Sequence, residues 1–220
     1  MRSARRLAIV FLGVLLVVSS ACDAGRPPRA TAASYDPFTQ QLVQLNADQN
    51  GDGRMDQWSF LDGNRPLRGE ADSDADGRVD RWEYFDGQGA LVRVGTSSLN
   101  DGLEDTWTWV AGTGGEMRID HARRRDRQID RREFFRDAVL VRAEEDSNAD
   151  GRPDRWDRYD GSILRQAEFD TTLTNGRANR RLIYDSGGRF LRVEADPELD
   201  GTFVTISDAA APGASEGKPR

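Results

Sequence analysis

The chain has one cysteine, one histidine and one lysine among its 220 residues, and these shortages exclude several kinds of chemistry. With Cys22 alone, no intrachain disulfide can form. His121 has no second histidine with which to complete a zinc site or a nucleophile pair. The longest apolar run covers residues 7–18, which is too short for an ordinary membrane-spanning helix. No group of residues marks a catalytic pocket, so we expect no enzymatic activity.

The first 22 residues have the composition of a secretion leader. Three arginines precede the apolar run, and Ser19, Ser20 and Ala21 stand directly before Cys22. This arrangement resembles the cleavage box of bacterial lipoproteins, in which the cysteine is lipidated and becomes the mature N-terminus. The resemblance implies a signal peptide over residues 1–21, lipidation of Cys22, and a lipid-anchored location in the bacterial cell envelope, on a periplasmic or outer membrane surface. The alternative is an ordinary signal peptide that is cleaved nearby.

The balance of charge is acidic. The formal net charge is −7, and removal of the three leader arginines takes it to −10. Aspartates clustered in short segments favour cation binding and argue against nucleic acid as a partner. Residues 22–40 are typical of a flexible tether and residues 208–220 of a disordered tail. The region between them, 41–207, has the size of one domain.

Tryptophan recurs through this domain with a period of 24–25 residues. The recurring position is occupied by Trp58, Trp82, Trp107, Arg132, Trp156 and Arg181. Stacked supersecondary units give such a period, because each unit buries its apolar side chains against its neighbours. We therefore expect the aromatic residues to form a shared core. The alternative is a strip of aromatic side chains that binds a polysaccharide or a protein.

Each repeat has the pattern of a β-hairpin. Trp82, Glu83 and Tyr84 alternate aromatic and charged side chains, as a strand with one buried face does, and an Asp-Gly-containing turn follows at 86–89. Glycine and proline interrupt the segment before residue 72, so two helices cannot flank the Asp-rich segments. The predicted fold is all-β, a repeat array of antiparallel β-hairpins joined by Asp-rich calcium loops.

The Asp-rich segment 72–83 has an oxygen donor at every ligand position of a calcium loop. Acidic residues occupy positions 1, 3, 5, 9 and 12, glycine occupies position 6, and position 7 offers its main-chain carbonyl. Segments 48–59 and 146–157 repeat the pattern. The predicted Ca²⁺ ligands are Asp72, Asp74, Asp76, Arg78, Asp80 and Glu83 in loop two; Asp48, Asn50, Asp52, Arg54 and Asp56 in loop one; and Asp146, Asn148, Asp150, Arg152, Asp154 and Asp157 in loop five.

Turn formation is the simpler explanation for these residues, because Asp and Asn cap turns through their own side chains. It accounts for one Asp and one Gly per loop, but not for five acids within residues 72–83, whose mutual repulsion a cation would offset. Copies three, four and six have other residues at several ligand positions. A partial loop begins at Asp196.

Two resemblances support this fold. The loops are similar to the EF-hand loop and, without its helices, to those of dockerins and thrombospondin type 3 repeats. Residues 184–190, with the sequence Tyr-Asp-Ser-Gly-Gly-Arg-Phe, are similar to the Tyr-Asp-x-x-Gly-Arg signature of YD/Rhs repeats, which form strips of β-hairpins. Together the resemblances imply a calcium-binding hairpin array in a bacterial lipoprotein.

The expected function is that of a lipid-anchored cell-envelope protein with calcium-binding repeats and a structural or scaffolding role. Its partners would be calcium ions and a membrane, the latter reached through the lipid on Cys22. One alternative is an envelope polysaccharide- or protein-binding module in which metal is incidental. Another is an enzyme whose site the repeats conceal, which a deep pocket lined by several copies would favour.

Overall fold

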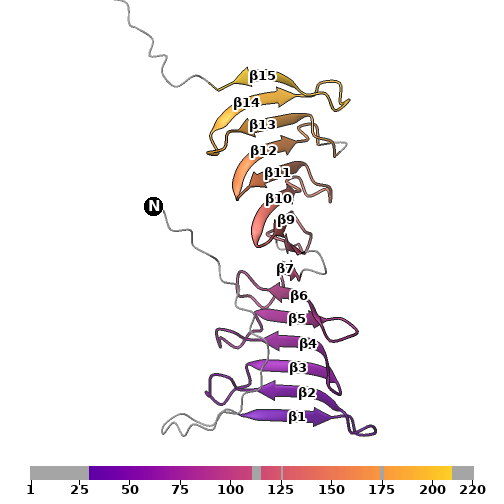
Figure 1. The fold of residues 1–220 in the computed structure, drawn as a ribbon. Helices are drawn as coiled ribbons and strands as arrows, with labels where there is room; N and C mark the ends of the chain where they lie inside the picture. Colours follow the sequence, from indigo (N-terminus) through magenta and orange to yellow (C-terminus); the bar gives the residue numbers. More distant parts are fainter. Residues whose placement is uncertain (1–29, 111–114, 125, 174–175, 210–220) are drawn as a thin grey trace, which may run out of the picture.

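The structure is a computed structural model, and it describes residues 30–110, 115–124, 126–173 and 176–209. Over these residues it is all-β, with fifteen strands and no helix (Figure 1). The strands form one open antiparallel sheet in which each strand pairs with its neighbours in the sequence. The predicted fold class, a repeat array of antiparallel β-hairpins, is confirmed. None of the described segments is a helix capable of crossing a membrane.

The strands are short and regularly spaced. Their bounds are β1 Thr31–Tyr35, β2 Leu42–Ala47, β3 Gln57–Asp62, β4 Arg65–Ala71, β5 Arg81–Phe85, β6 Leu91–Thr96, β7 Thr106–Trp109, β8 Glu116–His121, β9 Arg131–Arg136, β10 Val139–Glu145, β11 Arg155–Asp160, β12 Ile163–Phe169, β13 Arg180–Tyr184, β14 Phe190–Ala195 and β15 Val204–Asp208.

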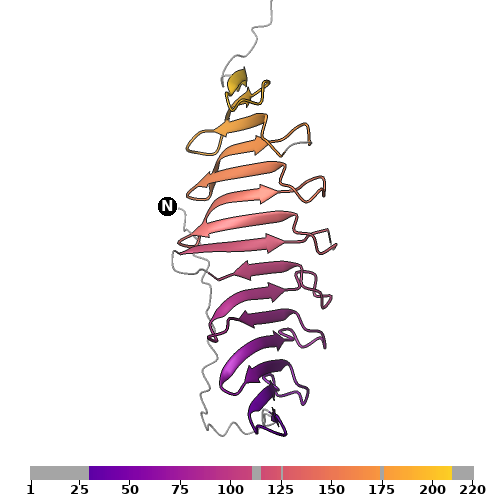
Figure 2. The same cartoon turned by 90° about the vertical axis from the view of Figure 1, so that its right-hand side faces the viewer.

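Two kinds of connection alternate along the chain. Where the structure describes the whole connection, tight turns close the hairpins, and the longer Asp-rich loops join one hairpin to the next along the other side of the array (Figure 2). In the tight turns, Asp86 accepts hydrogen bonds from the N–H groups of Gln88 and Ala90 at 2.8 and 2.9 Å, and Asp185 holds its turn in the same way. These backbone donors lower the pKa of both carboxyl groups. The turn predicted at residues 86–89 is therefore confirmed.

Cross-strand register explains the repeated sequence pattern. One row across the sheet runs through Tyr84, Arg93, Trp109, Arg118 and Phe134, so that aromatic rings alternate with guanidinium groups. The guanidinium carbon of Arg93 lies 3.9 Å from the ring centroid of Tyr84, and that of Arg118 lies 4.8 Å from that of Trp109. Such cation–π contacts give each arginine a neighbour on the adjacent strand.

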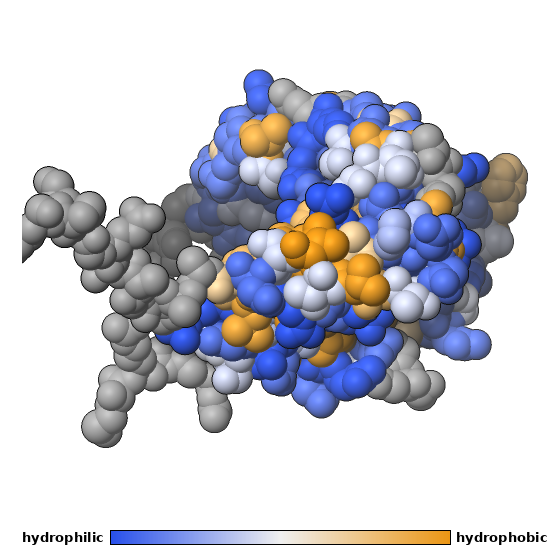
Figure 3. Space-filling model, turned by 90° about the horizontal axis from the view of Figure 1, so that it is seen from above, coloured by the Kyte–Doolittle hydropathy of each residue, from blue (hydrophilic) through white to orange (hydrophobic). Residues whose placement is uncertain are grey.

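The array has little hydrophobic core. Among the described residues the buried apolar side chains are Trp82, Ala122, Ala143 and Ala167. The tryptophans expected in a shared core lie in one register position, but only Trp82 is buried and the other three are half-buried. Seen along the array, the surface is mainly hydrophilic with small apolar patches (Figure 3). Stability must therefore come chiefly from pairing and packing between neighbouring hairpins.

The ordered array begins earlier than the sequence indicated. The predicted tether, residues 22–40, contains β1, which pairs with β2 from Thr31 opposite Ala47. The N–H of Asp48 also donates to the carbonyl of Ala30. The backbone of β2 thus finds a partner that side-chain patterns do not reveal. At the other end β15 reaches Asp208, one residue beyond the predicted domain limit. The signal peptide, Cys22 and most of the predicted tail lie outside the described residues.

Candidate cation-binding loops

Consecutive loops are linked to one another by the backbone. In loops two to six, the N–H of the first residue donates to the carbonyl of the ninth residue in the preceding loop. Asp72 donates in this way to Asp56, and Asp170 to Asp154, each at 2.9 Å. The position-6 glycines of loops one, two and five have φ angles of +90°, +94° and +84°, a conformation that side chains disfavour. The Asp-Gly pairs therefore build loops that stack in register.

The position-1 carboxylates hold the loops from inside. Asp72 Oδ2 accepts the N–H of Gly77 at 2.8 Å, and its Oδ1 accepts the N–H of Asp76 at 3.1 Å. Asp48 and Asp146 accept corresponding bonds from their own position-6 glycines at 2.8 and 2.9 Å. All three aspartates are buried. These contacts are the turn chemistry that the sequence offered as an alternative, so part of the Asp content has a role without any ion.

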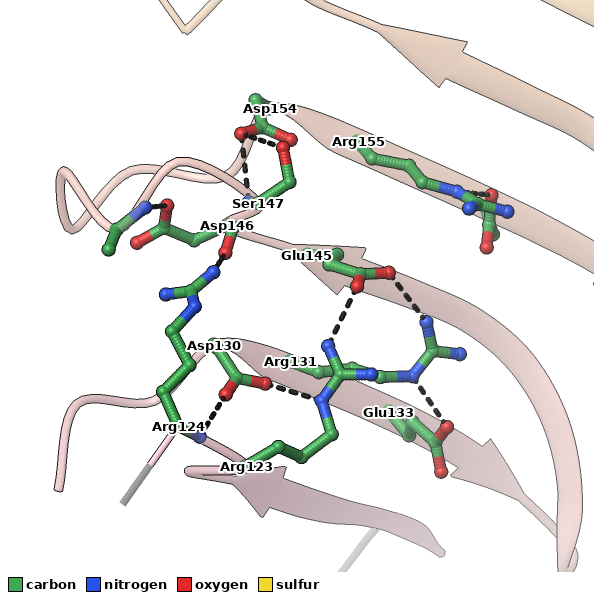
Figure 4. Close-up of polar contacts among 12 residues, drawn as sticks. Arg123, Arg124, Asp130, Arg131, Glu133, Glu145, Asp146, Ser147, Asp154 and Arg155 are labelled. Carbon is green, nitrogen blue, oxygen red and sulfur yellow. Dashed lines mark hydrogen bonds and ion pairs between the residues drawn. The ribbon is translucent and has the colours of Figure 1, made fainter. Parts of the chain in front are cut away.

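The position-9 carboxylates hold the opposite side of each loop. Asp80 accepts the N–H of Ser73 at 2.9 Å and its hydroxyl at 2.7 Å. Asp154 accepts the N–H and the hydroxyl of Ser147 at 2.8 and 2.7 Å (Figure 4). In loop one the N–H of Gln49 donates to Asp56 at 3.0 Å. The position-2 hydroxyl was not identified from the sequence, although serine recurs there.

Loop two brings three carboxylates together. Asp72, Asp74 and Asp80 each offer one oxygen, and these three oxygens lie within 4.8 Å of one another. Within the described part of the chain this is the one group of three or more His, Cys, Asp or Glu side chains with such geometry. Convergent carboxylate oxygens from one loop are the ligand type that Ca²⁺ and Mg²⁺ prefer. Loop two is therefore the best candidate for a cation site.

The carboxylates at positions 3 and 5 of loop two also share a donor from loop three, which joins β6 to β7. Asn100 Nδ2 lies 2.6 Å from Asp74 Oδ2 and 3.1 Å from Asp76 Oδ2. The Oδ1 atom of Asn100 is buried and accepts no hydrogen bond from any residue that the structure describes. The amide thus holds the two carboxylates together from the neighbouring repeat.

The position-5 side chains organise the chain at position 7. The N–H groups of Arg54, Arg78 and Arg152 each donate to the carboxylate two residues earlier at 2.8 Å. Positions 3 and 5 are also joined in loops one and five, where Asn50 and Asn148 donate through Nδ2 to Asp52 and Asp150 at 3.2 and 3.1 Å.

The predicted position-12 ligands lie in strands. Glu83 is in β5 and forms an ion pair with Arg81 at 2.9 Å. Asp157 is in β11, buried, and pairs with Arg155 at 2.9 Å. Neither residue belongs to a cluster of potential metal ligands in the described structure. The reason is that the outgoing strands β5 and β11 begin at position 10, so that position 12 lies on a face of the sheet.

A cavity of about 140 Å³ lies between loops one and two. Its lining includes Asn50, Asp52, Asp56, Asp72 and Trp58. A space of this size holds several water molecules. Potential ligands from two consecutive loops thus line one space that is large enough for water.

Two functional features were missed by the sequence analysis. Asp170 is buried and its carboxylate accepts the N–H groups of Leu173 and Gly176, as a position-1 residue does, although loop six is one residue longer than the period predicts. Glu104 accepts the indole N–H of Trp107 at 2.5 Å and also the hydroxyl of Tyr84. Burial and the Glu104 carboxylate together raise the pKa of Tyr84.

Comparisons with known proteins add no family assignment. No protein-family model matches the chain, and no curated protein matches it by sequence.

Proposed function

We propose that this chain is a lipid-anchored cell-envelope protein whose Asp-rich loops bind Ca²⁺ and whose role is structural or scaffolding. The observation that supports calcium binding best is the group of carboxylate oxygens from Asp72, Asp74 and Asp80. Several oxygens from one short loop suit a hard cation, and a flexible loop suits Ca²⁺ better than Mg²⁺, which demands near-ideal octahedral geometry. The proposal includes no enzymatic activity.

The way in which the loops are joined supports the proposed scaffolding role. In loops two to six the first residue is hydrogen-bonded to the ninth residue of the preceding loop, for example Asp72 to Asp56. Both positions belong to the predicted ligand set. A cation that fixes one loop therefore also restrains its neighbour, and through it the angle between successive hairpins. The thin core makes such an added restraint valuable.

Calorimetric titration of the full chain with Ca²⁺ tests this proposal. Extracellular calcium loops have dissociation constants of about 0.1–1 mM, and we expect this range, with loop two binding most tightly because it carries the most carboxylates. Asp76→Ala is expected to abolish the site in loop two and to leave those in loops one and five. Absence of heat and of any thermal shift at ~10 mM Ca²⁺ would refute metal binding.

The membrane anchor rests on the leader sequence. Cys22→Ser removes the acyl acceptor, and the protein is expected to leave the membrane fraction because the remaining chain has no long apolar run. Mass spectrometry of the mature N-terminus is the direct measurement. An unmodified N-terminus downstream of Cys22 would contradict the anchor without affecting the calcium proposal.

The second candidate is a polysaccharide- or protein-binding module. It is favoured by the aromatic row, since no second layer of the described structure covers Tyr84 and Trp109. Arg93 stacks against both rings, at 3.9 and 5.4 Å from their centroids, which makes the row a packed surface as well. Retention on an envelope polysaccharide in the presence of EDTA, and its loss in Trp109→Ala, would favour this candidate over the calcium scaffold.

A further inference from the structure

Loop four, between β8 and β9, joins its hairpins differently from loops two, three and five. In those loops the position-2 serine hydroxyl donates to the position-9 carboxylate at 2.7 Å. Loop four has Arg123 at position 2, and its Nε lies 2.6 Å from Oδ1 of Asp130, the position-9 residue. Positions 1 and 3 are Ala122 and Arg124, so the loop has no carboxylate at either of these ligand positions.

The guanidinium of Arg123 joins two elements. Its Nη2 lies 2.7 Å from Oε1 of Glu145, which ends β10 in the next hairpin (Figure 4). The Glu145 carboxylate continues to Arg131 at 3.2 Å, and Arg131 to Glu133 at 2.8 Å. Positive and negative groups thus alternate from loop four across β9 and β10, and each charged group named here has an opposite partner.

Burial strengthens one of these contacts. The Asp130 side chain is only 1% exposed, whereas that of Arg123 is 51% exposed. A hydrogen-bonded counter-charge stabilises a buried carboxylate, because an unpaired charge in the interior is unfavourable. Partial burial lowers the pKa of Arg123, but the hydrogen bonds and charges of Glu145 and Asp130 outweigh this effect, so the pKa is raised. Loop four lacks carboxylates at ligand positions 1 and 3, where they would help to bind a cation. Arg123 therefore supplies the positive charge in this loop.

Loop four is also fixed to the beginning of loop five. Arg124 donates its backbone N–H to Asp130 Oδ2 at 3.2 Å, and its Nη2 donates to the main-chain carbonyl of Asp146. The N–H of Asp146 donates to the carbonyl of Asp130 at 2.9 Å. Hydrogen bonds from loop four and from the start of loop five thus meet at Asp130 and Asp146 (Figure 4).

We propose that Arg123 is a covalently tethered counter-cation, which closes loop four and locks it to the next hairpin without a metal ion. The array then has two kinds of joint, one that responds to calcium and one that does not. The contrast with loops one, two and five rests on the proposed calcium binding, but the role of Arg123 does not. The arginine-rich segment is thereby a structural element, with Arg123, Arg124 and Arg131 engaged within the chain rather than free for a polyanion.

Hydrogen exchange of the full-length protein, in Ca²⁺ and in EDTA, tests the lock. Arg123→Gln is expected to lower protection at residues 122–124, 126–130 and 139–145 by about tenfold or more, and by the same factor in both conditions. Arg127→Gln is the matched control. Arg127 lies in the same loop, is exposed, and forms no ion pair with the residues that the structure describes. Equal effects of the two substitutions would overturn the proposal, as would a loss in EDTA alone.

Two further variants keep the test decisive. Glu145→Gln is expected to lower protection in the same segments, and its effect and that of Arg123→Gln are expected to be non-additive, because both break one bridge. If Arg123→Gln unfolds the whole array, Arg123→Lys replaces it. Lysine keeps the charge but not the planar fork, so we expect local loss at loop four with other hairpins unchanged. Unfolding of the whole array in Arg123→Lys as well would then overturn the proposal, because the retained positive charge would have had no effect. A lack of calcium response in loops one, two and five would refute the calcium proposal and leave this one standing.

Discussion

Replacing Asp72 and Asp74 in separate variants distinguishes turn chemistry from metal binding in loop two. Both residues contribute an oxygen to the same carboxylate group. They differ in burial, since Asp72 is 8% exposed and Asp74 lies in the exposed part of the loop. Asp72 accepts two backbone N–H groups, whereas Asp74 accepts one, from Asp76 at 3.2 Å, and the amide of Asn100. The first residue shapes the loop with or without an ion, and the second is positioned mainly as a ligand.

The expected magnitudes follow from these contacts. A hydrogen bond to a charged acceptor contributes about 1.5–3 kcal/mol, and the Asp76 N–H is shared between two acceptors. Asp72→Ala in EDTA is therefore expected to lower the free energy of opening loop two by about 2–4 kcal/mol. Asp74→Ala in EDTA is expected to change it by only about 0.5 kcal/mol, as an exposed substitution. With Ca²⁺ at a hundred times its dissociation constant, each variant is expected to lose a further ~2.7 kcal/mol that binding adds to the wild type.

Hydrogen exchange of residues 72–80 is the appropriate assay, because a long repeat array need not unfold in one cooperative step and exchange reports local opening. Six measurements suffice, namely the wild type and each of the two variants in Ca²⁺ and in EDTA. Equal loss of protection in EDTA for both variants would refute the division of roles. An identical wild-type exchange rate in Ca²⁺ and EDTA would show that packing alone holds the loop.

Three further predictions concern other parts of the array. A Cβ at Gly95 would lie 2.5 Å from Oε2 of Glu104, so Gly95→Ala is expected to displace that carboxylate and destabilise β6–β7 by about 1–3 kcal/mol, measured by local exchange. His121 and the guanidinium of Arg131 lower the pKa of Glu133 from 4.5 to about 2. The ionised Glu133 therefore stabilises the fold above pH 4.5, and this contribution is lost as the pH falls toward 2. Acid unfolding in EDTA is expected to be less steep in this window for Glu133→Gln, and an unchanged profile would contradict the assignment. The Asn100 amide is hydrogen-bonded to two predicted ligand carboxylates, those of Asp74 and Asp76. Asn100→Gly, in which glycine tolerates the φ of +52°, is therefore expected to tighten calcium binding to loop two several-fold in a titration. Weaker binding would mean that Asn100 is itself a ligand.

The repeat and its β-hairpin unit could both be predicted from the amino-acid sequence. Every strand pairs with its neighbours in the chain, so the rules that decide the fold are local ones: alternation around Trp82, Asp-Gly turns such as 86–89, and a constant period. The same locality made the Asp-rich loops predictable, because all the candidate ligands of a loop come from one continuous segment. Nothing in such a fold requires distant segments to find one another.

Features that depend on pairing between repeats could be seen only in the folded structure. β1 has no repeat signature, and only its pairing with the edge of β2 in the folded sheet shows its place. Asp170 stands one residue out of period, so its role appears only once loop six is folded. Glu104 reaches Tyr84 twenty residues away in the chain, and Arg123 reaches Glu145 after twenty-two. Side-chain contacts across neighbouring hairpins depend on register and on the reach of each side chain. Neither quantity is written in the periodic pattern, and both are fixed only when the strands are paired.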